Sequence, residues 1–489
     1  MTERESAMEA VAADVADVPL VVDLDGTLAR TDTLHEAILS LVANNPVNLF
    51  RLSGWLKEGK AAFKSKIASE ALVGADTLPL NEAVVALVRE ARAEGRRTAL
   101  VSASDERQVA MVAEATGLFD EFHGSDGTRN LGGEAKAAML VERFGEGGFD
   151  YVGDAKVDLA VWTRARRAIT VGVSDTLRAE VDSIDTEAQH LVADRPTGTG
   201  AAKRYLKAMR PHQWLKNLLV FAPAAAAHDM AAMVPSFFAF LAFSLAASSV
   251  YLINDMLDLP ADRNHPRKCR RPFAAGDIPV TGGVIAAGAL VGTSLIIAAL
   301  TSLGFLAVLI GYLILTTAYS MDLKRRAIVD IWTLGALYTT RIVAGGVAAG
   351  VELSTWFLAF SMFLFLSLAA VKRQSEIKDL AKRGGNWIAG RGYRVDDLPV
   401  VLAIALASGY CSVLVLALYI SSEKVAQFYG VPELLWCVCA LLLYWVGRMT
   451  LISHRGDMDD DPIVFALKDK VSIGVVGFAM LLVVASTVL

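Results

Sequence analysis

The 489-residue sequence contains only four cysteines, Cys269, Cys411, Cys437 and Cys439, too few for a disulfide framework at this length. Cys437 and Cys439 lie in an apolar run, where we expect small buried hydrophobic side chains. The first twenty residues lack a basic stretch followed by an apolar core, so no cleavable signal peptide is predicted. The soluble N-terminal part is therefore expected in the cytoplasm.

Charged residues make up only 20% of the chain, whereas hydrophobic residues make up 54% and the mean hydropathy is +0.43. These values exclude a single soluble domain and a disordered chain. Residues 1–200 contain 33 Asp and Glu against 21 Lys and Arg, a net charge of −12. Residues 201–489 contain 19 against 26, a net charge of +7. Because the acidic half would repel phosphate backbones, no nucleic-acid partner is expected.

Short apolar stretches alternate with helical patterns over residues 18–193, which predicts an α/β domain with a parallel sheet. Residues 1–17 are expected to be a tail. Residues 194–204 are expected to be a linker, because the sequence Arg195-Pro-Thr-Gly-Thr-Gly200 favours neither helix nor strand. The expected strands are Leu20–Val22, Thr98–Val101, Tyr151–Val152 and Ile169–Val173, with helices at Asn81–Ala93 and Gln108–Thr116.

Residues 205–489 contain apolar runs that are each long enough to cross a bilayer as a helix. Four of the intervening loops hold nineteen Lys and Arg, and the other four hold only Lys424. This strict alternation predicts an all-α polytopic domain in the inner membrane, with a cytoplasmic N-terminus and an external C-terminus. The nine expected spans are residues 214–228, 236–253, 283–300, 303–320, 331–350, 354–371, 399–420, 433–452 and 471–488.

Polar groups follow the predicted strands of the acidic half. Asp23 and Asp25 come directly after the strand that ends at Val22, where the ligand sites of open α/β sheets lie. Carboxylates hold Mg²⁺, one carboxylate can attack phosphorus, and a lysine and a hydroxyl neutralise phosphoryl oxygens. Groups suited to these roles follow along the chain, namely Ser102, Lys136, Asp154 and Asp158.

These residues resemble the haloacid dehalogenase (HAD) phosphatase superfamily, on the motifs Asp23-Leu-Asp25-Gly26-Thr27 and Gly153-Asp154-Ala-Lys-Val-Asp158. The resemblance covers residues 18–193 and implies a Rossmannoid HAD-like fold. It implies that Asp23 is the nucleophile and Asp25 the general acid/base. It also implies phosphate binding by Thr27, Ser102 and Lys136, and a Mg²⁺ site made by Asp23, Asp25, Asp154 and Asp158.

The 76 residues between Asp25 and Ser102 exceed what a bare crossover needs, so a helical cap is expected at about residues 31–80. Caps in this superfamily select substrates. The stretch Leu49-Phe-Arg-Leu-Ser-Gly-Trp55-Leu mixes apolar and basic residues. This stretch could contact lipid or pack inside the cap, and packing is the favoured interpretation.

A second set of acidic residues lies where the second span reaches the cytoplasm. Asn254, Asp258 and Asp262 are spaced four residues apart, which places them on one helical face. Oxygen ligands at this spacing can hold Mg²⁺ against a diphosphate. Asp255 points about 100° away and ranks lower. The cations that follow suit free phosphate groups, namely Arg263, Lys268 and Arg271.

Other polar residues occur near the membrane half's predicted cytoplasmic side. Asp322 and Lys324 end the fourth span, and Asp330 opens the fifth. Arg341 lies near the middle of the fifth span, where an arginine costs at least ~2.5 kcal/mol and should face a polar cavity with an anionic ligand. Lys216 and Asn217 flank the first span, as candidates for substrate binding.

This half resembles the UbiA superfamily of intramembrane prenyltransferases, whose nine helices agree with the count above. Within it, the residues look most like the decaprenyl-phosphate phosphoribosyltransferases. That family transfers phosphoribose from phosphoribosyl pyrophosphate (PRPP) to a polyprenyl phosphate. Asp322 and Asp330 depart from the usual DxxxD spacing, so the metal role is assigned to Asp330. The motifs are Arg210-Pro-His-Gln-Trp-Leu-Lys-Asn217, the residues from Asn254 to Pro272, Arg341-x-x-Ala-Gly-Gly346 and the segment that begins at Asp460.

We therefore expect a bifunctional, Mg²⁺-dependent membrane enzyme. Its membrane half would make polyprenyl-phosphoryl-5-phosphoribose, with Asp258 and Asp262 as catalytic residues, and its acidic half would remove the 5-phosphate. Three alternatives stay open. The membrane half could be an aromatic prenyltransferase, the chain could be a lipid-binding regulator with a vestigial phosphatase, or the phosphatase could act on a soluble metabolite. The sequence leaves the oligomeric state open and allows a homo-oligomer.

Overall fold

The computed structural model describes residues 18–45, 47–192, 199–227, 229–382, 384–387, 390–422, 425, 429–458 and 461–488. The chain divides into two compact units. The first contains the residues up to Met209 together with Tyr251–Ala286, and the second contains Arg210–Val250 and Ala287–Leu489. The expected tail, residues 1–17, and part of the expected linker, residues 194–198, lie outside the described residues. From Thr199 the chain is helical, in α10 (Thr199–Met209).

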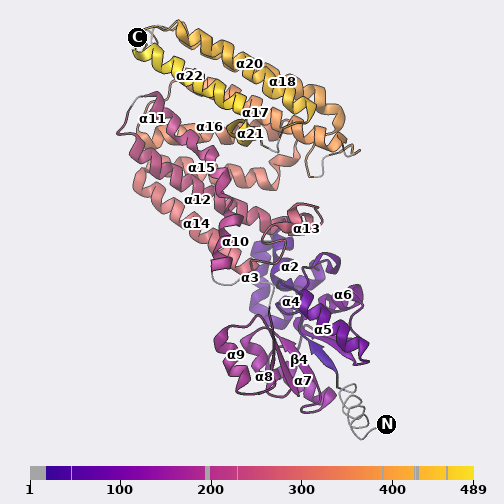
Figure 1. The fold of residues 1–489 in the computed structure, drawn as a ribbon. Coiled ribbons are helices and arrows are strands. Elements are labelled where there is room, and N and C mark those ends of the chain that lie inside the picture. The colour runs from indigo at the N-terminus through magenta and orange to yellow at the C-terminus, as the bar shows by residue number, and fades with distance from the viewer. Residues whose placement is uncertain are drawn as a thin grey trace, which may run out of the picture. The chain divides into compact units, whose positions relative to one another are not determined.

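A six-stranded parallel sheet forms the centre of the first unit, in the order β3-β2-β1-β4-β5-β6 (Figure 1). This confirms the expected α/β domain with a parallel sheet. β3 and β6 are not expected from the sequence, because both are short and carry polar or charged side chains. The strands are β1 (Leu20–Val22), β2 (Thr98–Asp105), β3 (Glu121–Ser125), β4 (Asp150–Gly153), β5 (Arg167–Val171) and β6 (Gln189–Leu191).

Both faces of this sheet are buried. Leu20 and Val22 pack into one apolar core and Val21 into the other, because successive side chains of a strand point to opposite faces. Helices α5 (Glu82–Ala93) and α6 (Glu106–Thr116) contribute to the first core. The second core is closed by α7 (Glu134–Phe144), α8 (Leu159–Trp162) and α9 (Asp175–Asp182). A sheet covered on both faces leaves its strand ends as the place for polar chemistry.

Helices also occupy the stretch between β1 and α5, where the sequence predicts a cap. Leu41, Leu52 and Ile67 bury one side of these helices in the first core. Asp32 caps the first of them by accepting a hydrogen bond from the backbone N–H of His35 at 3.0 Å. The elements are α2 (Thr33–Asn44), α3 (Asn48–Trp55), η1 (Leu56–Glu58), α4 (Lys60–Glu70) and η2 (Ala75–Thr77).

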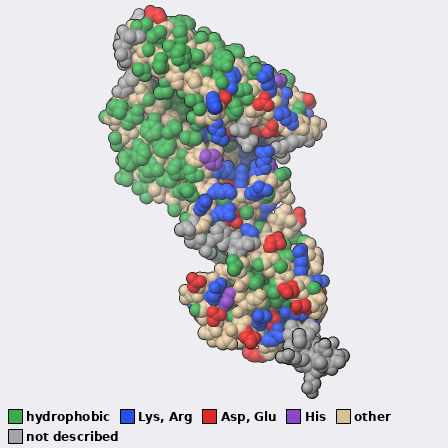
Figure 2. Space-filling view, viewed as in Figure 1, with side chains coloured by type: hydrophobic (Ala, Val, Ile, Leu, Met, Phe, Trp, Pro, Cys, Tyr) green, Lys and Arg blue, Asp and Glu red, His purple; other side chains and the backbone are tan. Residues whose placement is uncertain are grey.

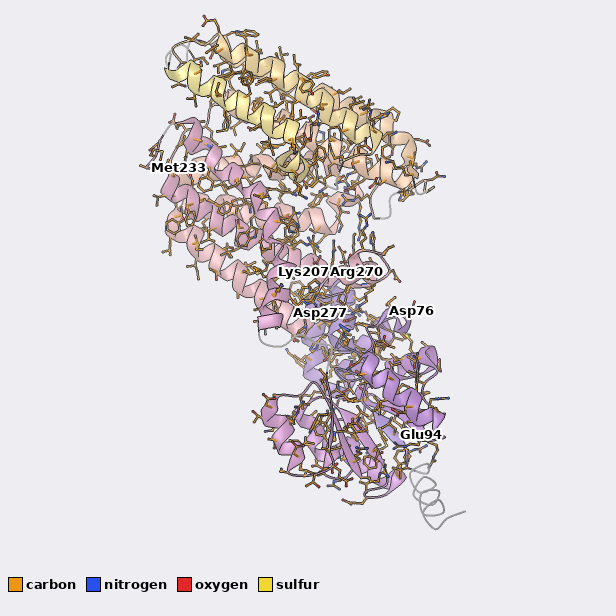
Figure 3. The ribbon with its side chains drawn as sticks, viewed as in Figure 1. Asp76, Glu94, Lys207, Met233, Arg270 and Asp277 are labelled. Carbon is orange, nitrogen blue, oxygen red and sulfur yellow. The ribbon has the colours of Figure 1, made fainter. Side chains whose placement is uncertain are left out.

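The segment Tyr251–Ala286 packs within the first unit, against the start of the cap. The guanidinium of Arg263 forms two hydrogen bonds with the carboxylate of Glu36, at 2.7 and 2.5 Å, and both side chains are buried. Arg30 and Arg204 bind the two carboxylate oxygens of Asp277, at 3.2 and 3.0 Å. Asp277 is labelled in Figure 3. These ion pairs link the segment from Arg263 to Asp277 with α2, with the turn before α2 and with α10 (Thr199–Met209).

The second unit is helical, and hydrophobic side chains gather over its surface in Figure 2. A helix satisfies its own backbone hydrogen bonds, which a lipid environment demands. The elements from residue 211 onward are η4 (Pro211–Phe221), α11 (Ala222–Ala226), α12 (Met233–Leu257), α13 (Leu259–Arg263), η5 (Lys268–Arg270), α14 (Val280–Thr301), α15 (Leu303–Met321), η6 (Leu323–Arg325), α16 (Val329–Ala349), α17 (Thr355–Lys382), η7 (Val395–Asp397), α18 (Leu398–Ile420), α20 (Leu434–Arg455), α21 (Pro462–Lys468) and α22 (Lys470–Val488).

Seven helices in the described part of the chain are long and apolar enough to cross a membrane. They correspond to seven of the nine expected spans. Ser302 separates α14 from α15 as expected, because its hydroxyl accepts the backbone N–H of Phe305 and starts a new helix. The other two expected spans are less regular or less apolar. Residues 214–228 fall on η4 and the short α11, and residues 331–350 fall on α16, which carries Asp330 and Arg341.

Candidate functional site

Three aspartates lie together at the carboxyl ends of β1 and β4. Ligand oxygens of Asp23, Asp154 and Asp158 lie within 4.8 Å of one another, the only such acidic, His or Cys group of three in the described part of the chain. β1 and β4 are neighbours in the sheet, so the segments that follow them meet at one edge. Carboxylate oxygens are the ligands that Mg²⁺ prefers, so the donor set fits this ion.

A glycine allows this close approach. Gly26 has a φ of +83°, and a Cβ atom there would lie 2.1 Å from Oδ2 of Asp154. No side chain fits in that space, which explains the Gly of the Asp-x-Asp-Gly-Thr motif. The next residue, Thr27, donates its hydroxyl to Oδ1 of Asp154 at 3.3 Å. The motif therefore folds back onto the acidic cluster and places the Thr27 hydroxyl at its edge.

Lys136 reaches the cluster from α7. Its Nζ lies 3.0 Å from Oδ1 of Asp23 and 3.8 Å from Oδ1 of Asp158, and it donates to the hydroxyl of Tyr151 at 2.8 Å. Tyr151 in turn donates to Asp158 at 2.8 Å. The cluster contains three carboxylates and one ammonium, so it keeps a net negative charge that a divalent cation would neutralise. The phosphate-binding role expected for Lys136 stays a prediction.

Asp25 belongs to a separate hydrogen-bond network. Its Oδ1 accepts the backbone N–H and the hydroxyl of Thr33, both at 2.7 Å. Its Oδ2 accepts the hydroxyls of Ser104 at 2.5 Å and of Ser102 at 3.3 Å. Asp25 is not a member of the three-aspartate group, and the metal role expected for it stays a prediction. A carboxyl group that is hydrogen-bonded to several hydroxyls is suited to proton transfer. General acid/base catalysis is the second role expected for Asp25.

The two carboxyls of the motif have perturbed acidities. Burial raises the pKa of Asp23 to about 6, and the negative charge of Asp158 adds to this while Lys136 opposes it. Burial also raises the pKa of Asp25, and the nearby Asp32 raises it further. A carboxyl with a raised pKa near neutral pH can carry a proton to a leaving group. The arrangement is suited to nucleophilic attack by one carboxylate and proton transfer by the other.

The raised pKa of Asp23 predicts a pH dependence. A nucleophile must be ionised, so at low Mg²⁺ we expect phosphatase kcat/KM to fall about tenfold per pH unit below pH 6. Saturating Mg²⁺ should move the midpoint to lower pH, because a nearby cation favours the carboxylate. The measurement is a pH–rate profile with p-nitrophenyl phosphate at two Mg²⁺ concentrations. A midpoint near pH 4 at low Mg²⁺ would contradict the assignment.

The cap adds a residue that the sequence motifs do not reveal. Lys64 of α4 donates to the backbone oxygen of Ala103 at 2.6 Å and to the amide oxygen of Asn130 at 2.8 Å. Burial lowers its pKa, whereas the negative charge of Asp25 raises it. Lys64 therefore lies close to the motif carboxyls and is a candidate for substrate contact. A lone lysine on a predicted helix carries no spacing signal, so only the folded structure identifies it.

The acidic segment after the second expected span is divided between two helices. α12 ends at Leu257 and α13 begins at Leu259, with Pro260 in its first turn. Proline lacks the N–H that would continue the helix ladder. The backbone N–H of Asp258 still donates to the carbonyl of Asn254 at 2.9 Å, and that of Asp262 donates to the carbonyl of Asp258 at 2.8 Å. Asn254, Asp258 and Asp262 therefore keep helical spacing, with Asp258 exposed and Asp262 buried.

Arg271 brings a second pair of carboxylates together. Asp255 and Asp262 are both buried, and both bind Nη1 of Arg271, at 3.1 and 2.6 Å. Helical spacing makes Asp255 a less favoured metal ligand than Asp258 and Asp262. In the structure Asp255 shares the guanidinium of Arg271 with Asp262. Nζ of Lys268 lies 4.0 Å from Asp262, at the limit of an ion pair. The oxygen donors suit Mg²⁺ by type, but in this structure the carboxylate of Asp262 is engaged with Arg271.

The second unit buries several cations. Arg341 of α16 donates to the amide oxygen of Asn217 at 2.8 Å and lies over the rings of Tyr312 and Tyr338. The ammonium of Lys216 also lies over Tyr338, 5.9 Å from the ring centre. The expected substrate-binding residues Lys216, Asn217 and Arg341 are therefore brought together. Among the described residues, no carboxylate pairs with Arg341.

Two further residues complete this cluster. Asp461 forms an ion pair with Lys216, and Nζ of Lys372 lies 3.5 Å from the same carboxylate oxygen. Asp461 is held in place because it also caps α21 through the N–H of Ile463 at 3.1 Å. Lys216 and Lys372 thus share one carboxylate and Arg341 pairs with none in the described residues, so this group of four carries two more positive charges than negative ones. Buried charges need partners, so the cluster is suited to an anionic ligand.

Asp330, expected as a metal ligand, is fully buried and already paired. Its oxygens lie 2.6 Å from Nε of Arg373 and 3.6 Å from Nη1 of Arg391, and one accepts the hydroxyl of Tyr319 at 2.8 Å. A metal ion would have to displace these groups, so the metal role of Asp330 stays a prediction. The expected phosphate ligand Lys324 lies in η6 and is half-buried.

Comparison with known families identifies both halves of the chain. The profile of the UbiA prenyltransferase family matches residues 218–468, more than half of the chain, and that of haloacid dehalogenase-like hydrolases matches residues 20–162. The chain belongs to the UbiA prenyltransferase family. It joins an N-terminal HAD-like hydrolase domain to a C-terminal UbiA domain, and its apolar helices make it an integral membrane protein.

Relatives resemble either the whole chain or the UbiA part. The uncharacterized protein y4nM of Sinorhizobium fredii is 38% identical over 479 residues, which covers 96% of this chain and 92% of the relative. The nodulation protein NoeC of Azorhizobium caulinodans is 35% identical over 283 residues, or 57% of this chain and 92% of NoeC. The decaprenyl-phosphate phosphoribosyltransferase of Mycolicibacterium smegmatis is 41% identical over 212 residues, or 41% of this chain and 66% of that enzyme.

Proposed function

We propose that the UbiA domain transfers 5-phosphoribose from PRPP to a polyprenyl phosphate, and that the HAD domain then removes the 5-phosphate to give polyprenyl-phosphoryl-ribose. The observation that carries the proposal is the positive surplus of the cluster Lys216, Lys372, Arg341 and Asp461. An acceptor phosphate would balance that surplus, whereas an aromatic acceptor needs fewer phosphate-binding cations. The similarity to a decaprenyl-phosphate phosphoribosyltransferase supports the same substrates.

In the transfer step, a phosphate oxygen of the lipid attacks ribose C1 of PRPP. A C1–O bond forms, the C1–O bond to the diphosphate breaks, and the diphosphate leaves with the electron pair. The proposal assigns the acceptor phosphate to Lys216, Lys372 and Arg341. It assigns the diphosphate to the segment of Asn254, Asp258 and Asp262 with its cations Lys268 and Arg271. Arg263, which the sequence also offers as a phosphate ligand, is buried and paired with Glu36 instead. Mg²⁺ held by oxygen donors of that segment would neutralise the diphosphate charge when bound.

In the hydrolysis step, the carboxylate of Asp23 attacks the phosphorus of the 5-phosphate, and Asp25 donates a proton to the departing ribose oxygen. Water then cleaves the aspartyl-phosphate, with Asp25 accepting a proton. Lys136 lies 3.0 Å from Asp23 and stabilises the charge of the phosphoryl oxygens, with Thr27 and Ser102 as further donors. Mg²⁺ held by Asp23, Asp154 and Asp158 supplies further charge neutralisation when bound.

Fusion of the two activities has a chemical rationale. The transfer product carries a phosphomonoester, which is the bond that a HAD phosphatase cleaves. Tethering keeps the second site at an effective concentration of about millimolar, provided that the linker can span the distance. Removal of the phosphate also makes the transfer hard to reverse. The topology belongs to the same proposal: nine spans, with the HAD domain and the basic loops on the cytoplasmic side and the C-terminus outside.

The deciding experiment is mass spectrometry of lipid products after the purified full-length chain is incubated with PRPP, Mg²⁺ and a polyprenyl phosphate. We expect polyprenyl-phosphoryl-ribose and two released ions, diphosphate and phosphate. Formation of a prenylated aromatic compound from a prenyl diphosphate, with no PRPP-dependent lipid, would establish the aromatic prenyltransferase instead. Release of no phosphate from the PRPP-dependent lipid would refute the coupled hydrolysis and leave a soluble metabolite as the phosphatase substrate.

Lys372 tests the acceptor assignment. Loss of one charge-assisted hydrogen bond of about 1.5 kcal/mol corresponds to roughly a tenfold weaker binding. We therefore expect Lys372→Met to raise KM for the polyprenyl phosphate about tenfold and to leave KM for PRPP within about twofold. The matched control is Lys382→Met, at the exposed end of the same helix. Equal shifts of both KM values would speak against a role specific to the acceptor.

A further inference from the structure

The outer face of cap helix α3 exposes large apolar side chains. Phe50 is 78% exposed and Leu49 60%, and Val47 and Leu56 at the two ends of the helix are exposed to the same degree. The opposite side of α3 is anchored, because Leu52 is buried in the first core and Asn48 donates to the backbone oxygen of Leu41 at 3.0 Å. Packing inside the cap, the interpretation that the sequence favours, is therefore wrong for Leu49 and Phe50.

These apolar side chains lie in a basic stretch of an acidic domain. From Val47 to Glu70 the chain has five Lys and Arg against two Glu, a net charge of +3, within a half whose net charge is −12. Two of the cations are paired, Arg51 with Glu70 and Lys66 with Glu58. The exposed cations Lys57 and Lys60 follow Leu56 directly. Exposed apolar residues flanked by basic ones are the composition of a segment that lies in a membrane interface.

We propose that α3 and η1, from Val47 to Lys60, form a bilayer-contact surface, with Leu49, Phe50 and Leu56 inserted among the lipids and Lys57 and Lys60 on anionic headgroups. The local net charge of +3 favours a bilayer as the partner, because basic residues attract anionic headgroups. The rest of this acidic domain would be repelled by such a surface. The chain is itself an integral membrane protein, so the cap is covalently tethered to membrane-spanning helices. An exposed apolar face would otherwise be a liability for the domain.

The same cap leads to the phosphatase site. α4 follows η1 after Gly59 and carries Lys64, whose ammonium lies beside Ala103 at the end of β2. Thr33 in the first turn of α2 binds Asp25. A cap that touches the bilayer with α3 would thus present membrane-bound phosphomonoesters, rather than soluble ones, to Asp23. This consequence rests on the proposed function, whereas the bilayer contact itself does not.

The test uses the full-length chain in nanodiscs that contain anionic lipid. All four native cysteines are replaced, and Phe50→Cys is labelled with an environment-sensitive fluorophore. We expect a blue-shifted emission that is quenched by lipids brominated in the acyl chain. The matched control is a label at Ile184→Cys. Ile184 is an exposed apolar residue outside the cap segment, and a label there should show neither change. Absence of quenching at position 50, or equal quenching at both positions, would overturn the proposal.

A second variant separates lipid contact from other occupants. Leu49→Asp/Phe50→Asp should lower hydrolysis of the lipid-linked 5-phosphate at least fivefold and leave p-nitrophenyl phosphate hydrolysis within twofold. Equal loss of both activities, or cross-linking of position 50 to a second copy without lipid quenching, would overturn the bilayer contact. Quenching at position 50 in a parent protein that does not hydrolyse the lipid-linked phosphate would support the contact and refute the proposed function.

Discussion

The Asp23→Asn protein should accumulate polyprenyl-phosphoryl-5-phosphoribose and form almost no dephosphorylated lipid. An amide cannot attack phosphorus as a carboxylate does, so hydrolysis should fall on the order of 10³-fold or more. The substitution is nearly isosteric and removes one negative charge from a cluster in which three carboxylates face one lysine. We therefore expect the domain to remain folded. The readout is the ratio of the two lipids by mass spectrometry, with inorganic phosphate release as a second measure.

The control for this experiment is Asp76→Asn, an exposed aspartate of the same domain (Figure 3). It should leave both lipids at parental levels. Total PRPP-dependent lipid should also be unchanged in Asp23→Asn, because its membrane domain is intact. Continued formation of the dephosphorylated lipid would show that another group attacks phosphorus. Loss of both lipids would show instead that the substitution damages the whole chain.

The Asp258→Ala protein should make neither lipid. Asp258 is exposed between α12 and α13, so its removal leaves the buried pairs of Asp255 and Asp262 with Arg271 in place. Loss of a carboxylate that positions charge around the diphosphate should lower transfer about 100-fold or more. Hydrolysis of p-nitrophenyl phosphate should stay within about twofold, because the phosphatase groups lie on other elements. Product lipids and soluble phosphatase activity are measured on the same preparation.

Asp322→Ala is the matched control for Asp258→Ala. Asp322 is also exposed and pairs with Arg326 on the surface at 2.8 Å, a contact worth little in water. We expect less than about a twofold change in transfer. A large loss in Asp322→Ala would assign this residue to the reaction after all. Parental transfer in Asp258→Ala would remove Asp258 from the catalytic residues and direct attention to Asp255 and Asp262.

The phosphatase site was largely predictable from the sequence. Asp23, Asp154 and Asp158 lie together as the strand pattern predicts, because the carboxyl ends of the neighbouring parallel strands β1 and β4 meet at one edge of the sheet. Thr27, Ser102 and Lys136 also contact carboxylates of this site, Lys136 from helix α7. The separate network of Asp25 was not predictable. It depends on Thr33 and Ser104, whose hydroxyls carry no motif, and on the fold that brings α2 beside the end of β2.

The membrane half was predictable as apolar helices but less so in its polar details. Helical spacing aligns Asn254 with Asp258 and Asp262, whereas in the structure Arg271 joins Asp255 to Asp262. Which carboxylates Arg271 reaches depends on the path that the loop takes, and this path is set by tertiary contacts.

By itself, the sequence determined the division into an acidic α/β domain and a basic set of apolar helices, because composition and periodicity are local properties. It also determined the phosphatase motif, because the polar residues of the motif directly follow predicted strands. Only the tertiary structure decided which charges share a site. Lys216 and Asp461 are 245 positions apart, and Arg341 and Asn217 are 124 apart. Which buried charge meets which partner depends on the packing of distant helices, and no local pattern in the sequence encodes that packing.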